Sequence, residues 1–118
     1  MKGYPHHYQV SATATEQSAE VLLSSAGLES LVTAPPIEFD GPGDRWSPEN
    51  LLVGSIADCL IMTFRAIARA TKTDWISLDC DVVGTLDRDQ GVTRFSEYSI
   101  TARLVVPAGT DLAAAEKA

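Results

Sequence analysis

The chain has 118 residues, and its sixteen acidic and nine basic residues give a net charge of −7. This length is typical of one domain, and a hydrophobic share of 45% is that of a folded protein. The negative charge argues against partners such as nucleic acid or an anionic membrane surface, because binding to both depends on Lys and Arg. With two cysteines and no apolar N-terminal segment, the sequence predicts a cytoplasmic protein with reduced thiols.

The N-terminal region, from 7 to 33, is predicted to form short strands. Polar and apolar residues alternate from 7 to 15, and this period of two indicates a strand. Two further strands are predicted at 20–25 and 29–33. A loop from 34 to 46 follows, because its prolines and glycines continue neither a helix nor a sheet.

A long helix is predicted from Pro48 to about Thr71. Ser47 suits the N-cap, and Pro48 suits the first helical position, where the N–H that it lacks has no helical acceptor. Apolar residues lie on nearly all sides of this helix, as in a buried central helix. Its most apolar run, Leu51 to Met62, is too short to span a bilayer. Because the chain offers little else to cover such a helix, we expect a homodimer.

A period of two returns after the helix and predicts strands between 75 and 106 that are joined by a hairpin turn at Asp87 to Gly91. A second helix is predicted from 111 and is unfinished at Ala118, so we expect the natural domain to continue beyond the sequence. The expected fold class is α+β, with an antiparallel sheet, a long buried central helix and one domain over 1–118.

Cys59 is the first candidate for chemistry. From composition and spacing alone, a small core residue is the simpler interpretation of a cysteine in mid-helix. The neighbouring Asp58 disfavours a thiolate, so a reactive Cys59 needs a cation from the tertiary or quaternary structure. Cys80 lies between two aspartates in a predicted strand and is expected to be an inert core thiol.

Glu49 and Arg45 are the charged candidates near the start of the helix. Glu49 is most simply a first-turn acid that complements the helix dipole. About 15 Å of helical rise separates it from Cys59, so it could reach only the cysteine of a second copy. Arg45 is either a solvated loop residue or the partner of an anion. No spacing typical of a metal site or a phosphate-binding loop occurs, and no cofactor is expected.

The segment from Pro35 to Leu60 resembles the OsmC/Ohr family, in which a Gly-rich loop leads to Ser-Pro-Glu, paired leucines and Ala-x-Cys inside a long helix. The resemblance implies an intertwined homodimer of α+β subunits. It also implies a bacterial thiol peroxidase that reduces organic hydroperoxides during oxidative or osmotic stress. In that chemistry Cys59 attacks the peroxide as a thiolate and becomes a sulfenic acid, while Glu49 orients an arginine. A second, resolving cysteine then forms a disulfide with Cys59, and an external dithiol reduces the disulfide.

Two departures from the family pattern bear on this expectation. The family's arginine lies between the first two strands, where Thr15 to Glu20 hold none, and Arg45 is the candidate substitute. The family's resolving cysteine would lie beyond Ala118. We therefore expect a thiol-dependent peroxidase with Cys59 as its nucleophile. The alternatives are a non-catalytic OsmC-like dimer that binds a small apolar ligand, and a structural stress protein without a site.

Overall fold

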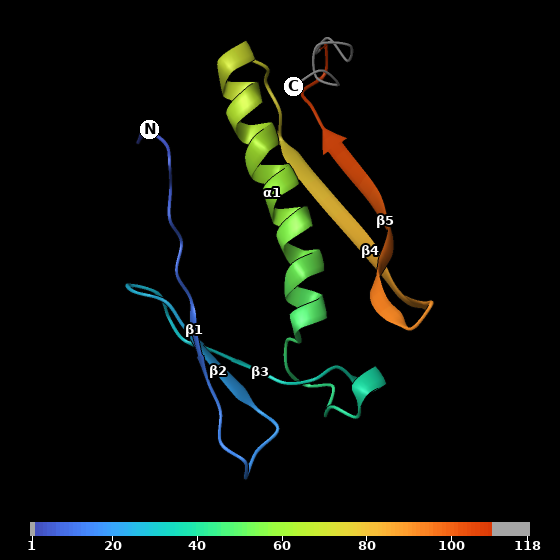
Figure 1. Ribbon diagram of the computed structural model, residues 1–118. Coiled ribbons are helices and arrows are strands. Elements are labelled where there is room, and N and C mark those ends of the chain that lie inside the picture. The colour runs from blue at the N-terminus through green and yellow to red at the C-terminus, as the bar shows by residue number, and fades with distance from the viewer. Residues whose placement is uncertain (1, 110–118) are drawn as a thin grey trace. The chain divides into compact units, whose positions relative to one another are not determined.

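The structure is a computed structural model that describes residues 2–109, so the helix predicted from 111 lies outside the described residues. The chain forms two compact units, residues 1–51 and 52–118. One long helix and two antiparallel sheets give the α+β class that the sequence predicts (Figure 1).

The first unit contains a three-stranded antiparallel sheet of β1 (Ser11–Thr13), β2 (Val21–Ser24) and β3 (Leu31–Thr33), in that order. The predicted strand at 7–15 is wrong in its length, because only its central three residues pair. β1 pairs with β2, which has four residues and ends at a turn, so the backbone of the flanking residues has no neighbouring strand to bond.

The loop between β3 and the long helix is fixed by backbone contacts. Ala34 N–H donates to the carbonyl oxygen of Trp46 at 3.0 Å, and Thr33 forms a parallel bridge with the same residue. At Gly41 the chain passes so near Pro35 that an added Cβ would overlap the proline carbonyl, so only glycine fits. The loop thereby brings the chain back beside β3 immediately before the helix begins.

The helix α1 (Pro48–Thr71) has an N-terminus capped by two side chains that bond each other. The fully buried Ser47 accepts a hydrogen bond from Asn50 N–H at 3.1 Å, and its hydroxyl donates to Asn50 Oδ1 at 2.8 Å. At the other end, Thr73 N–H donates to the carbonyl oxygen of Ala68 at 2.8 Å and closes the last turn. Both ends are therefore set by local sequence.

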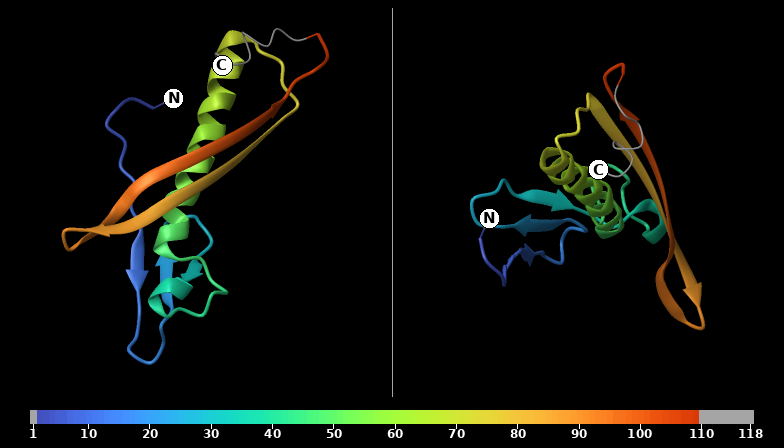
Figure 2. Two further views of the ribbon diagram at one scale, coloured as in Figure 1. Left: turned by 90° about the vertical axis from the view of Figure 1, so that its right-hand side faces the viewer. Right: turned by 90° about the horizontal axis from the view of Figure 1, so that it is seen from above.

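In the second unit, β4 (Ser77–Asp89) and β5 (Val92–Val105) form a long antiparallel hairpin beside α1 (Figures 1 and 2). Its turn has Gln90 and Gly91 at positive φ, which matches the right-handed twist of the strands. The hairpin approaches the helix closely at Gly84, where an added Cβ would lie 2.8 Å from Val53 Cγ2.

The hairpin leaves much of α1 uncovered. Within the helix, Phe64 and Ala68 are buried, and Phe64 packs edge-on against Trp75 with ring centroids 5.4 Å apart. In contrast, Leu52 is 47% exposed and Met62 is 59% exposed. The sequence predicts a buried helix, and among the described residues the β4–β5 hairpin leaves these side chains of α1 exposed.

By length and composition, α1 is one helix among the described residues that could cross a membrane, with a mean hydropathy of 1.8 over its most apolar stretch. The expectation from the sequence concerns the shorter run Leu51 to Met62, whereas this property belongs to the whole helix of 24 residues. The core helix of a soluble protein passes the same test, so this property is weak evidence for a membrane location.

Replacing the capping serine tests the start of α1. Ser47→Ala should lower the free energy of unfolding by about 1–2 kcal/mol, because it leaves the N–H group of Asn50 without its acceptor. Denaturant unfolding measures the change. Ser55→Ala is the control, since Ser55 is exposed and its hydroxyl donates to a carbonyl oxygen three residues earlier. Equal stability of the two variants would contradict the capping role.

The close approach of the hairpin to α1 gives a second test. Gly84→Ala should cost about 1–3 kcal/mol, because its Cβ would crowd Val53 and would lie 3.0 Å from Phe95 Cε1. The double variant Val53→Ala with Gly84→Ala removes the crowding methyl group, so the second substitution should cost less in that background. Purely additive losses in denaturant unfolding would show that the two positions do not touch.

Candidate functional site

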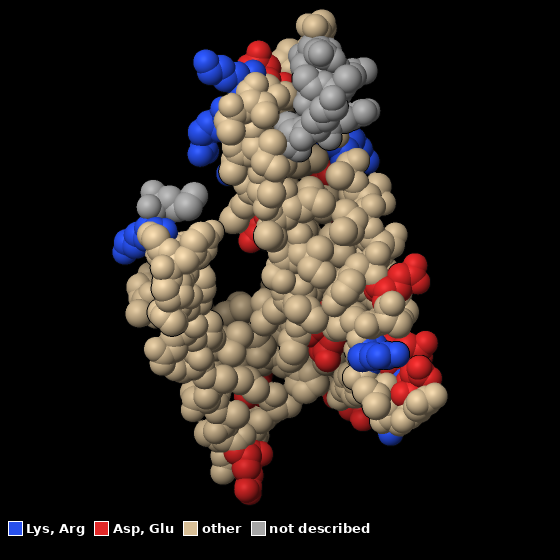
Figure 3. Space-filling view, turned by 45° about the horizontal axis from the view of Figure 1, so that its top comes forward, with Lys and Arg blue, Asp and Glu red and all other residues tan. Residues whose placement is uncertain are grey.

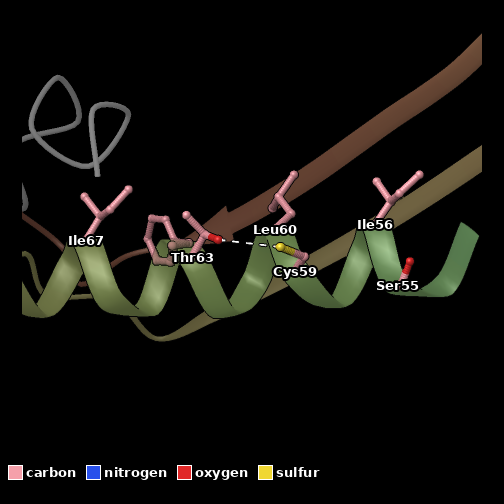
Figure 4. A pocket seen from close by; sticks show the side chains of 7 residues that line it. Ser55, Ile56, Cys59, Leu60, Thr63 and Ile67 are labelled. Atoms are coloured by element: carbon pink, nitrogen blue, oxygen red, sulfur yellow. Dashed lines mark hydrogen bonds between the residues drawn. The ribbon is translucent and has the colours of Figure 1, made fainter. Parts of the chain in front are cut away.

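A shallow apolar groove of about 650 Å³ runs along one face of α1 and contains Cys59 (Figure 4). Its lining residues recur at helical spacing and project from the same side of the helix: Ser55, Ile56, Cys59, Leu60, Thr63, Phe64 and Ile67. The groove therefore combines a thiol and two hydroxyls with aliphatic side chains. It places an exposed thiol beside an apolar surface.

Cys59 is exposed, and its Sγ lies 3.9 Å from Thr63 Oγ1, one helical turn away. A hydroxyl can donate to a thiolate, so Thr63 is suited to stabilise the ionised sulfur. The Ser55 hydroxyl instead donates to the carbonyl oxygen of Leu52 at 2.6 Å. Within residues 2–109, no Lys or Arg side chain is bonded to Cys59.

Cys80 occupies a different environment. It is half-buried in β4, opposite Ala102 of β5, and both cysteines are free thiols. The expectation that Cys80 is an inert core residue stays a prediction, as does the nucleophilic role of Cys59. The difference in exposure makes Cys59 the more accessible thiol.

Glu49 lies in the first unit beside a small cavity of about 230 Å³. The rest of its lining is almost entirely apolar: Ala19, Val21, Thr33, Ala34, Pro35, Pro36, Phe39 and Pro48. The Oε1 atom of Glu49 is buried and has no hydrogen-bond partner among the described residues. A buried carboxylate oxygen without a donor is costly, so this atom is suited to receive a cation or another donor.

Arg45 is held by a residue that the sequence analysis did not single out. Its Nε donates to Glu20 Oε2 at 3.1 Å, and both side chains are about half exposed, at 46% and 48%. Among the described residues, no bond joins Arg45 to Glu49. The two charged candidates lie in the same unit and are not paired with each other.

The charges of the second unit lie mainly away from the groove. Figure 3 shows charged side chains gathered at the end of α1 and at the tip of the β4–β5 hairpin, with mostly neutral surface between them. At that tip, Arg94 pairs with Asp89 at 3.5 Å, and further along the strands Arg103 lies 4.0 Å from Asp79. Among residues 2–109, no group of three His, Cys, Asp or Glu side chains could hold a metal ion.

The sequence profile of the OsmC-like protein family matches residues 41–118. This range covers about two thirds of the chain and includes both α1 and the β4–β5 hairpin. The chain therefore belongs to the OsmC-like family, and the resemblance noted in its sequence is confirmed. The chain is also similar to YmaD, an uncharacterized protein of Bacillus subtilis, with 26% identity over 93 residues. That match covers 78% of this chain and 61% of YmaD, so the chain spans about three fifths of that relative's length.

Solved structures share the fold. An OsmC-like protein of unknown function from Vibrio cholerae superposes with a TM-score of 0.85 at 15% identity, over 96% of this chain and 84% of that one. An organic hydroperoxide resistance protein OsmC from Legionella pneumophila, also described as a predicted redox protein, gives a TM-score of 0.68 at 18% identity. That match covers 98% of this chain and 80% of the Legionella chain. Identities this low establish a common fold alone.

Proposed function

We propose that this protein is a thiol-dependent peroxidase that reduces organic hydroperoxides, with Cys59 as its nucleophile. The observation that carries the proposal is an exposed thiol in an apolar groove, with a hydroxyl group 3.9 Å from its sulfur. The family supports redox chemistry, because one structural relative is an organic hydroperoxide resistance protein. The expected role is defence against oxidative stress in the bacterial cytoplasm.

The reaction needs a thiolate and one proton. The Cys59 sulfur attacks the terminal oxygen of the hydroperoxide, the O–O bond breaks, and the proton passes to the departing alkoxide to give an alcohol. The cysteine is then a sulfenic acid. An external dithiol reduces it in two steps: one thiol displaces water and forms a mixed disulfide, and the second thiol releases Cys59. No bound cofactor enters this scheme.

In the proposed reaction, the groove favours organic peroxides over hydrogen peroxide. Ile56, Leu60 and Ile67 lie on the same face as the thiol, where they can contact the alkyl group of a substrate (Figure 4). Burying that alkyl group provides binding free energy that hydrogen peroxide cannot gain.

A second copy of the chain completes the proposed site. The exposed apolar side chains of α1 form a surface that a soluble domain covers, and symmetric homodimers are the commonest way to cover it. Glu49 and Arg45 belong to the helix start and the loop before it, whereas Cys59 lies beyond reach along the same helix. In the proposal, these two residues therefore serve the cysteine of the other copy, Arg45 as the cation for the thiolate and Glu49 as an orienting carboxylate.

The groove also favours a second candidate function, that of a non-catalytic dimer that binds a small apolar ligand. Its aliphatic lining would hold such a ligand whether or not the thiol reacts. The two functions differ in their dependence on the sulfur. Peroxide reduction requires Cys59, whereas apolar binding requires only the aliphatic wall.

Peroxide consumption tests the proposal. The purified protein, mixed with cumene hydroperoxide and dihydrolipoamide, should consume peroxide, and dimedone should label Cys59 as a sulfenic acid. Cys59→Ser should abolish consumption, whereas Cys80→Ser should retain it, because Cys80 plays no part in the proposed reaction.

Consumption no faster than that of Cys59→Ser would overturn the peroxidase. The binding alternative would then predict that a fluorescent apolar probe binds the wild type and Cys59→Ser equally. It also predicts weaker binding after Leu60→Glu, which places a charge on the aliphatic wall.

A further inference from the structure

The helix α1 carries three hydroxyl side chains, and they differ in what they bond. Ser55 and Thr71 donate to carbonyl oxygens of the preceding turn, at 2.6 and 2.9 Å. This bond to the backbone is the usual one for a Ser or Thr within a helix. Thr63 differs from both, because the partner of its hydroxyl is the sulfur of Cys59, at 3.9 Å (Figure 4).

The spacing of Thr63 and Cys59 accounts for this contact. Thr63 follows Cys59 by four residues, and helical side chains lean toward the N-terminus, so the threonine side chain lies over the turn that carries the sulfur. Both side chains are exposed and line the same groove. Among the described residues, no carbonyl oxygen accepts from the Thr63 hydroxyl, so this group is available to the sulfur.

The contact favours the ionised form of the sulfur. With a neutral thiol, either group can be the donor. A thiolate only accepts, so the Thr63 hydroxyl then donates to it, and a hydrogen bond to an ionised partner is about twice as strong as one between neutral groups. Because the bond strengthens on ionisation, it shifts the equilibrium from thiol toward thiolate.

The other titratable groups near Cys59 give the thiolate no support. Asp58 is exposed and projects about 100° around the helix from Cys59, and its negative charge disfavours a second anion. In the hairpin, Gly84 faces α1, so the titratable side chains on that face are Cys80 and Tyr98, and neither lines the groove. The charged residues of the strands lie on the opposite face or at the hairpin tip.

We propose that Thr63 activates Cys59: its hydroxyl donates to the sulfur and raises the fraction of thiolate at neutral pH. The thiol proton leaves to water, and Thr63 keeps its own hydroxyl proton. The inference rests on the proposed function, because it names the group that favours the ionised sulfur which peroxide reduction requires. It uses a contact within the second unit alone.

Exchange of the hydroxyl for a methyl group tests this role. In a Cys80→Ser background, Cys59 is the only thiol, and its rate of alkylation by iodoacetamide is measured against pH. Thr63→Val should move the midpoint of this profile upward by about 0.5–1 pH unit. The rate at neutral pH should fall about two- to fourfold and the plateau at high pH should persist, because a more basic thiolate is the better nucleophile. The kcat/KM for cumene hydroperoxide at neutral pH should fall by a similar factor.

Three further variants separate the hydroxyl from the change of shape. Thr63→Ser keeps a hydroxyl and should recover most of both losses. Thr63→Ala adds no new methyl group and should shift the midpoint as Thr63→Val does. The matched control is Thr71→Val, the same exchange on the same helix, where the hydroxyl is bonded to the backbone. It should leave alkylation and peroxide consumption at the values of the background protein.

The two readouts distinguish this inference from the proposed function. An unmoved midpoint in both Thr63→Val and Thr63→Ala would overturn the activation of Cys59, whatever the peroxide assay shows. A shift of equal size in Thr71→Val would overturn it as well, since it would reflect the helix as a whole. A midpoint that moves with Thr63 alone, in a protein that consumes no peroxide, would overturn the peroxidase and support the activation of Cys59.

Discussion

The packing of the apolar helix α1 determines which of its side chains are buried and which remain exposed. The helix is apolar on nearly all sides. The β4–β5 hairpin approaches it closely at Gly84, and Trp75, in the segment before β4, packs against Phe64. Phe64 and Ala68 are buried as a result, and other apolar side chains of the helix remain exposed. In the proposed dimer, a copy of the same chain covers these exposed side chains.

The exposed face of α1 would also determine where the proposed reaction takes place. Cys59 opens onto the uncovered face of α1, so in the proposed dimer whatever covers that face also forms the walls around the sulfur. The buried Oε1 of Glu49 has no hydrogen-bond partner among the described residues, and in the proposed dimer a second copy would bring one. An active site formed by two copies of the chain would lie on the exposed apolar face of α1.

Local features were predictable from the sequence, and contacts between distant segments were not. The start of α1 follows from neighbouring residues, because Ser47 and Asn50 cap each other across three positions. The first strand was predicted too long, since alternation shows which residues suit a strand and not how long its partner is. The ion pair of Glu20 with Arg45 depends on the register of β3 with two other segments, which no local pattern encodes. The Gly-rich loop, the Ser-Pro-Glu motif and Cys59 pointed to the family because their spacing is fixed within one short segment.

The mass of the protein in solution tests the central claim most directly. Sedimentation equilibrium of the wild type at micromolar concentration should give twice the chain mass of 12.6 kDa, because a second copy covers the exposed face of α1. A mass of one chain, unchanged as the concentration rises, would contradict the account. It would leave the apolar face of the helix uncovered and the groove around Cys59 complete within a single copy.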